Sequence, residues 1–205
     1  MPSISRLFCL IILCIGMGLA GCAGSFGAMD QRDALDKRLE NYALGPVEPA
    51  CDGCDFLVRD SVSKHNSEID PSHNTLSRAQ SGVKLYMFDG YSLEEAFIAL
   101  IESNIFTKRM NKDYREALVD ALRAGENDFR GESSKAQIGF ESSSTLSFGK
   151  RLNNPISEPR ALLDSVEILQ NERTGWRYSD SMEAFFVDGN VMIIHYYSQN
   201  EIWIK

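Results

Sequence analysis

The sequence lacks the short motifs that mark familiar enzyme classes. It has no Gly-x-Ser-x-Gly elbow of the serine hydrolases. The Gly149-Lys150 pair lacks the upstream glycine and the following Ser or Thr of a phosphate-binding loop. Glu94 and Glu95 are adjacent, so on a helix their carboxylates point in different directions and do not form an acid–base pair. From the sequence we therefore assign no catalytic residue, no metal ligand and no cofactor.

Basic residues are too few for a nucleic-acid-binding protein. The chain has 21 Lys and Arg against 29 Asp and Glu, a formal net charge of −8. Nucleic acids need clustered Lys and Arg, and anionic lipid surfaces attract polybasic segments. The acidic balance argues against both partners and suits a protein that stays soluble beside an anionic surface.

The chain also lacks a hydrophobic run long enough to span a membrane. Its longest run, from Leu7 to Ala20, has 14 residues, whereas a spanning helix needs about 20. A short run behind one basic residue, Arg6, is typical of a signal peptide. The run ends in Leu19-Ala20-Gly21-Cys22. This tetrad resembles the lipobox of bacterial lipoproteins, in which Leu, a small residue and Gly or Ala precede a Cys.

The lipobox resemblance implies that the signal peptide, residues 1–21, is removed and that Cys22 is lipidated. The thiol then carries a diacylglyceryl group and the new amine is acylated, so palmitate labelling is expected. Two or three acyl chains anchor a protein far more firmly than one. In enteric lipoproteins Asp after the Cys favours the inner membrane. Ala23 therefore favours the outer membrane with the domain in the periplasm, the inner membrane and the cell surface being alternatives.

Processing leaves residues 22–205, and this length suits one domain with a real core. Without Arg6 the mature chain keeps 20 basic and 29 acidic residues, a charge of about −9. We expect residues 22–28 to be a short tether, whose six residues after Cys22 reach about 20 Å when extended. Residues 29–205 then form a single domain that stays close to the bilayer.

Few cysteines remain after processing. Cys9 and Cys14 leave with the signal peptide, and Cys22 is used for the lipid. Only Cys51 and Cys54 are left, in a compartment outside the reducing cytosol. We therefore expect a disulfide between them that acts as a small structural clip.

Two other roles for the Cys51-x-x-Cys54 motif are weaker. A redox centre needs its first Cys at a helix start after a strand, but two prolines precede Cys51. Asp52 and Asp55 would also raise a thiol pKa. A zinc site could add His65 and His73, but seven residues separate these histidines, more than the three to five of a zinc finger.

Periodicity predicts an α+β domain with N-terminal helices packed on a C-terminal antiparallel sheet, a meander. Helices are expected over 29–42, from a Ser92 cap to about 103, and over 113–124. Residues 51–82 are expected to be irregular apart from a possible strand at 56–60. Asp188-Gly189 between apolar runs predicts a two-residue hairpin turn. A short helix from Ser157 and a loop at 141–145 are also expected. We expect His195, in the last hairpin, to be a structural histidine.

These features favour a non-enzymatic binding or assembly factor that contacts another envelope protein. An alternative is an immunity or exclusion lipoprotein that neutralises an incoming effector, which protection of cells against that effector would reveal. A periplasmic enzyme, thiol-based or hydrolytic, is the third hypothesis. Full function in a Cys51→Ser/Cys54→Ser variant would end its thiol version.

Lipidation at Cys22 is directly testable. Cys22→Ala should leave an unprocessed precursor without palmitate, because the modified thiol is missing. Metabolic labelling with palmitate, compared with the wild type, measures this. Palmitate retained by the variant would show that the lipobox interpretation is wrong.

Overall fold

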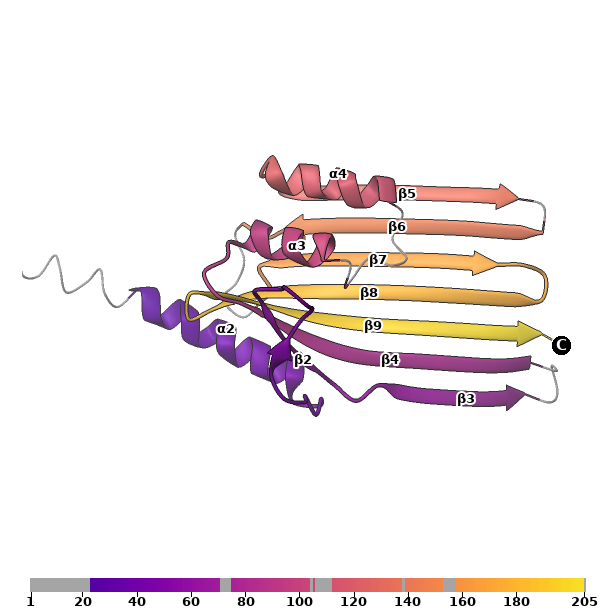
Figure 1. Cartoon of the computed structure of the whole chain (residues 1–205), viewed down its shortest axis with the longest axis horizontal. Helices are drawn as coiled ribbons and strands as arrows, with labels where there is room; N and C mark the ends of the chain where they lie inside the picture. Colours follow the sequence, from indigo (N-terminus) through magenta and orange to yellow (C-terminus); the bar gives the residue numbers. More distant parts are fainter. Residues whose placement is uncertain are drawn as a thin grey trace, which may run out of the picture.

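One antiparallel sheet forms the body of the protein (Figure 1). The structure is a computed structural model that describes residues 23–70, 75–103, 105, 112–137, 139–152 and 158–204. Within these residues the sheet has nine strands in the order β1-β2-β4-β9-β8-β7-β6-β5. The remaining strand, β3, pairs with β4 along the same edge as β2.

The central strands are long. The strands are β1 (Glu48–Pro49), β2 (Leu57–Asp60), β3 (Lys64–Asp70), β4 (Thr75–Phe88), β5 (Asp128–Gln137), β6 (Phe140–Lys150), β7 (Ala161–Gln170), β8 (Thr174–Val187) and β9 (Asn190–Ile204). The helices are α2 (Ala23–Leu39), α3 (Leu93–Glu102) and α4 (Lys112–Arg123). β4, β8 and β9 have 14, 14 and 15 residues, against about 5–6 in a typical strand.

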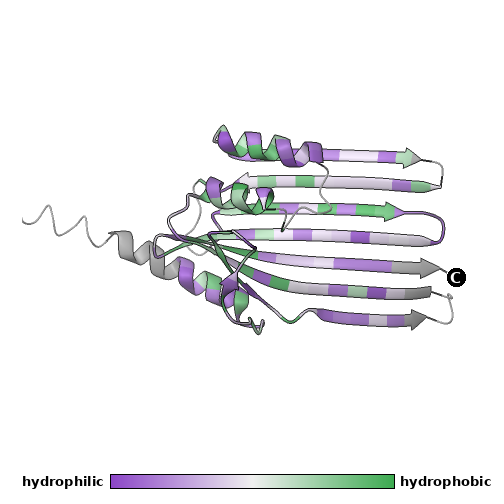
Figure 2. Ribbon diagram, in the orientation of Figure 1, coloured by the Kyte–Doolittle hydropathy of each residue, from purple (hydrophilic) through white to green (hydrophobic). Residues whose placement is uncertain are grey.

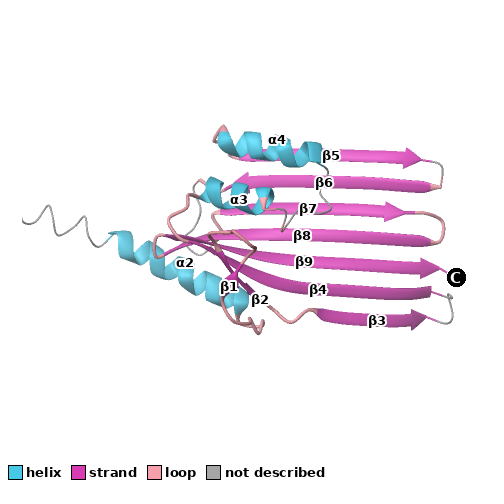
Figure 3. Cartoon of the chain, viewed as in Figure 1, coloured by secondary structure: helices cyan, strands magenta, loops and turns pink. Residues whose placement is uncertain are grey.

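The helices cover both faces of the sheet, but they lie only at one end of the strands (Figure 3). On one face, α3 and α4 bury Phe97 and Leu118 in a cluster with Ile193 of β9. On the other face, α2 buries Leu35 against Phe185 and Ile194. Successive side chains of a strand point to opposite faces. Neighbouring residues of β9 therefore pack in the two different core clusters.

The other end of the sheet forms what we call the uncovered half: residues 64–70, 75–81, 132–137, 140–145, 164–170, 174–181 and 197–204. None of the described helices extends over it (Figure 1). Apolar residues gather near the helices, whereas the strands beyond them are mostly hydrophilic or neutral (Figure 2). Serines 142–144 exemplify this composition. The uncovered half is therefore a single layer with solvent on both faces.

The two outer edges of the sheet carry charged side chains. On β3, Lys64 and Glu68 are exposed. On β5, Arg130 forms an ion pair with Glu132. Charged residues on edge strands hinder pairing with further strands.

The helices broadly match their sequence predictions. Ser92 caps α3: its hydroxyl accepts a hydrogen bond from the Glu95 N–H at 3.2 Å, and Glu95 accepts one from the Ser92 N–H at 2.8 Å. Hydrogen bonds to the Glu95 carboxylate, first from the Ser92 N–H and then from the Ser92 hydroxyl, lower the pKa of this carboxyl. Gly125, after α4, has a φ of 74° as a helix C-cap requires. α2, however, begins at Ala23 and ends at Leu39, so it includes the segment expected as a tether.

The strands depart more from the predictions. The Asp188-Gly189 turn is confirmed, because both residues have positive φ, 52° and 84°, as a type I′ hairpin needs. β2 lies at the possible strand expected at 56–60, whereas β3 and the start of β4 lie in residues expected to be irregular. The elements therefore do not run helices first and sheet second. Residues 141–145 lie within β6 rather than in a loop. After Ser157, which is outside the described residues, β7 replaces the expected helix from Ala161.

Gly82 of β4 leaves room for an aromatic ring to cross the strand. Tyr197, its partner on β9, lies where a Cβ on residue 82 would stand. The Tyr197 hydroxyl reaches beyond β4 to the Ser63 hydroxyl, at 2.8 Å. The glycine thus lets β9 contact the segment between β2 and β3.

We expect Gly82→Ala to lower the free energy of unfolding by about 1–2 kcal/mol, because Tyr197 must shift and lose its hydrogen bond. Gly149 of β6 is a matched control, since nothing lies within 4 Å of the position of its Cβ. Gly149→Ala should leave stability unchanged or raise it slightly. Urea denaturation measures both. An equal loss from Gly82→Ala in a Tyr197→Ala background would show that the ring is not the cause.

Candidate functional site

A cleft opens on the α3 side of the sheet, where the helix-covered end meets the uncovered half. Its volume is about 480 Å³, within the usual range for ligand sites. We call it the His195 cleft. Its walls come from β2, β4, β8, β9 and two connecting segments: Asp60, Ser63, Gln80, Lys84, Tyr86, Ile105, Tyr178, Asp180, His195, Tyr197, Ser198 and Gln199.

His195 and Asp180 form the centre of this cleft. His195 Nε2 lies 2.7 Å from Asp180 Oδ1. The two residues belong to neighbouring strands, with His195 opposite Met182 and Asp180 opposite Tyr197, so they are diagonal neighbours on one face. His195 is 5% exposed, whereas the Asp180 side chain is 26% exposed. The contact suits a histidine that is held in place, and the carboxylate remains accessible from the cleft.

Tyr86 supplies a buried hydroxyl to the same cleft. The residue is 1% exposed, and its hydroxyl has no hydrogen-bond partner among the described residues. Its ring stacks toward His195, with 6.2 Å between centroids. Burial raises the pKa of Tyr86, and the carboxylates of Asp60 and Asp180 raise it further. The phenol therefore stays neutral and can donate a hydrogen bond.

The charges around the cleft are largely paired. Lys84 Nζ lies 3.0 Å from Asp60 Oδ2, and Asp180 faces His195. The Ser63 hydroxyl is bonded to Tyr197, so it is not presented as an activated nucleophile. The arrangement offers donors and acceptors to a bound molecule rather than a Ser–His–Asp relay.

A second cleft, of about 450 Å³, lies on the opposite face beyond the end of α2. The residues that line it include Tyr42, Val83, Asp164, Val166 and Tyr196. The rings of Tyr42 and Tyr196 meet edge to face at 6.2 Å. Burial, and then the Glu183 carboxylate, raise the pKa of Tyr196. This cleft is more apolar in its side chains than the His195 cleft.

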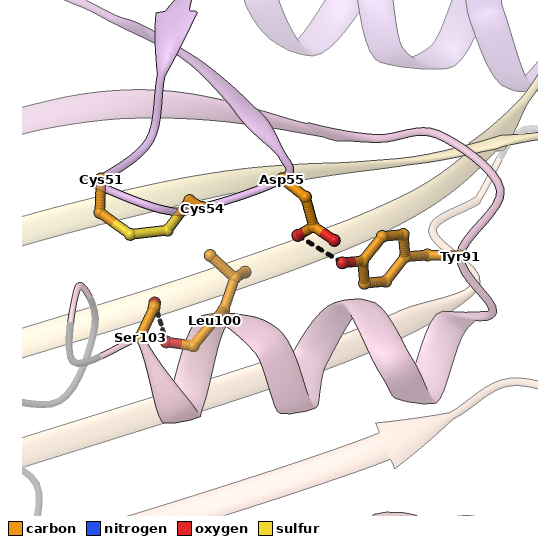
Figure 4. Close-up of a disulfide and its surroundings, with 6 residues drawn as sticks. All are labelled: Cys51, Cys54, Asp55, Tyr91, Leu100 and Ser103. Carbon is orange, nitrogen blue, oxygen red and sulfur yellow. Dashed lines mark hydrogen bonds between the residues drawn. A yellow bond between two sulfur atoms is a disulfide. The ribbon is translucent and has the colours of Figure 1, made fainter.

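Cys51 and Cys54 lie outside both clefts. Their sulfurs are at disulfide distance, with 5.1 Å between the Cα atoms, and the Cys54 N–H donates to the Cys51 carbonyl at 3.1 Å. Figure 4 shows the pair above α3, near Leu100 and Ser103. Gly53 between them has a φ of 80°, which glycine adopts readily. Cys54 packs against the α3 core cluster, a position that suits a clip.

The remaining sequence candidates are placed as follows. Cys22 and His73 lie outside the described residues. His65 lies on β3 rather than in a loop. Among the described residues no group of three His, Cys, Asp or Glu side chains is arranged to hold a metal ion.

Sequence reasoning missed Tyr86, Asp60 and Asp180 as neighbours of His195. One signal was available. A two-residue turn at Asp188-Gly189 pairs Val187 with Asn190. Counting residue pairs away from this turn places Asp180 diagonally across from His195 on the same face of the sheet. Tyr86 and Asp60 come from strands far away in the sequence, so no local pattern reveals them.

Comparison with known proteins gives no relative. The chain matches no family model, no curated protein and no solved structure. Within the described part of the chain, no helix is both long enough and apolar enough to cross a membrane.

The Cys51–Cys54 clip should contribute stability and no chemistry. Because the closed loop is very short, Cys51→Ser/Cys54→Ser should lower the free energy of unfolding by about 2 kcal/mol. Urea denaturation of the oxidised wild type, the reduced wild type and the variant measures this, and the last two should agree. A variant that keeps full stability but loses function would instead give the thiols a chemical role.

Proposed function

We propose that this protein is an outer-membrane lipoprotein that binds another component of the bacterial envelope without catalysing a reaction. The observation that carries the proposal is the uncovered half of the sheet, with a cleft on each face where it begins. Long strands with polar faces expose more surface than a self-contained core needs. Such a surface suits binding.

The position of α2 indicates how the uncovered half is oriented relative to the membrane in this proposal. α2 begins at Ala23, the residue after Cys22. Arg32 pairs with Asp188 in the β8–β9 turn, and Arg38 pairs with Glu183 at 2.9 Å. The middle of α2 therefore lies at the turn, and its start extends beyond the sheet at the end opposite to the uncovered half (Figure 1). In the proposed orientation the acyl chains lie beyond the turn and the uncovered half points away from the bilayer.

The length of β9 sets how far the clefts lie from the bilayer in this orientation. From Val191 to Tyr197 of β9 is about 20 Å at roughly 3.4 Å per residue, and the strand continues about as far again. The clefts would thus stand clear of the lipid headgroups.

We also propose that residues 29–205 form one domain, in which α2 packs on the C-terminal strands.

Site-specific photocrosslinking in cells tests the proposal. A photoreactive amino acid at Asn66 or Lys135 probes the two faces of the uncovered half, and one at Glu116 of α4 is the control at the covered end. All three positions are exposed. We expect adducts with an envelope protein, peptidoglycan or lipid from the first two positions and few from the third, because the binding surface lies in the uncovered half.

Two results would contradict this function. One is a complete absence of envelope adducts from Asn66 and Lys135 when the protein is present at its normal level. The other is equal crosslinking from Glu116, which would place the partner at the covered end.

A further inference from the structure

We propose that the His195 cleft binds a neutral saccharide unit through the Tyr86 hydroxyl and the second carboxylate oxygens of Asp60 and Asp180. The inference deepens the proposed binding function, because it names the class of ligand for one of the two clefts. It depends on three features of the cleft: an unused hydroxyl, paired charges and aromatic walls.

The unused hydroxyl belongs to Tyr86. A buried polar group without a partner is costly, so such a group in a native protein needs an explanation. Tyr86 lines the cleft together with Asp60 and Asp180. A ligand oxygen bound there can accept the hydrogen bond that the buried Tyr86 hydroxyl does not make within the described residues.

The charges select against an anionic ligand. Asp60 is paired with Lys84, and Asp180 with His195. With two carboxylates against one ammonium, a phosphate or carboxylate would meet net repulsion. Each carboxylate keeps a second oxygen that can accept from a ligand hydroxyl. A polyhydroxylated molecule can satisfy these acceptors and the Tyr86 donor together.

The walls suit a flat, partly apolar ring. Tyr178 and Tyr197 contribute aromatic surface, and Gln80 and Gln199 contribute side-chain amides. Aromatic side chains with polar tips combine apolar contact with hydrogen bonding. The faces of a sugar ring carry C–H groups while its rim carries hydroxyls, and a cleft of about 480 Å³ accommodates one or two such rings.

Saturation-transfer NMR and calorimetry on the full-length protein in detergent test the proposal. The probes are three trimers of equal length: N-acetylglucosamine (neutral), glucosamine (cationic) and galacturonate (anionic). We expect the neutral trimer to bind and the anionic trimer not to bind. Tyr86→Phe should weaken binding about tenfold, because only one hydrogen bond is removed.

The matched control is Tyr196→Phe, which removes a hydroxyl from the neighbouring strand on the opposite face of the sheet. It should leave binding unchanged. The melting temperature of Tyr86→Phe should be equal to or above that of the wild type, since the change removes an unpaired buried hydroxyl. A lower melting temperature would show that the hydroxyl is structural and would overturn the assignment.

Other outcomes also decide the question. Binding of the galacturonate trimer would overturn the charge argument. Stronger binding of the glucosamine trimer than of the neutral one would overturn the assignment to a neutral saccharide. If no trimer binds, the saccharide assignment fails. The photocrosslinks from Asn66 and Lys135 would still report independently on the proposed binding function.

Discussion

The two-residue turn at Asp188-Gly189 fixes the register of β8 and β9, and most of the molecule depends on this register. It places Ala184 opposite Ile193 and Phe185 opposite Met192. Because side chains alternate along a strand, one set faces α3 and the other faces α2. A slip by one residue would exchange the two sets. Both helices would then lose the apolar surface on which they pack.

The same register creates the His195 cleft at the point where apolar residues give way to polar ones. Up to Ile193, residues on the α3 side are covered by that helix and its neighbour. From His195 onward, the same face presents groups that form hydrogen bonds. The cleft therefore sits at a boundary of composition along the strands. Its polar groups are held by a sheet, a more rigid support than a loop.

Elements with local signals could be predicted from the sequence. The Ser92 cap and the Asp188-Gly189 turn each depend on a few adjacent residues, and both are present in the structure. β3 and the first half of β4 could not be predicted, because strands with solvent on both faces show no alternation of apolar residues. The first half of β4 pairs with β9, which is far away in the sequence, and β3 in turn pairs with β4. For the same reason Tyr86 was not recognised as a neighbour of His195.

The charged edges of the sheet affect what happens when many copies of the protein lie close together. An antiparallel sheet of long polar strands could extend sideways from molecule to molecule through its unpaired backbone groups. Lys64 on one edge and Arg130 on the other would have to give up hydration for such contact. Many copies can therefore share a small area and remain separate sheets, each with both faces open, instead of fusing into a continuous ribbon.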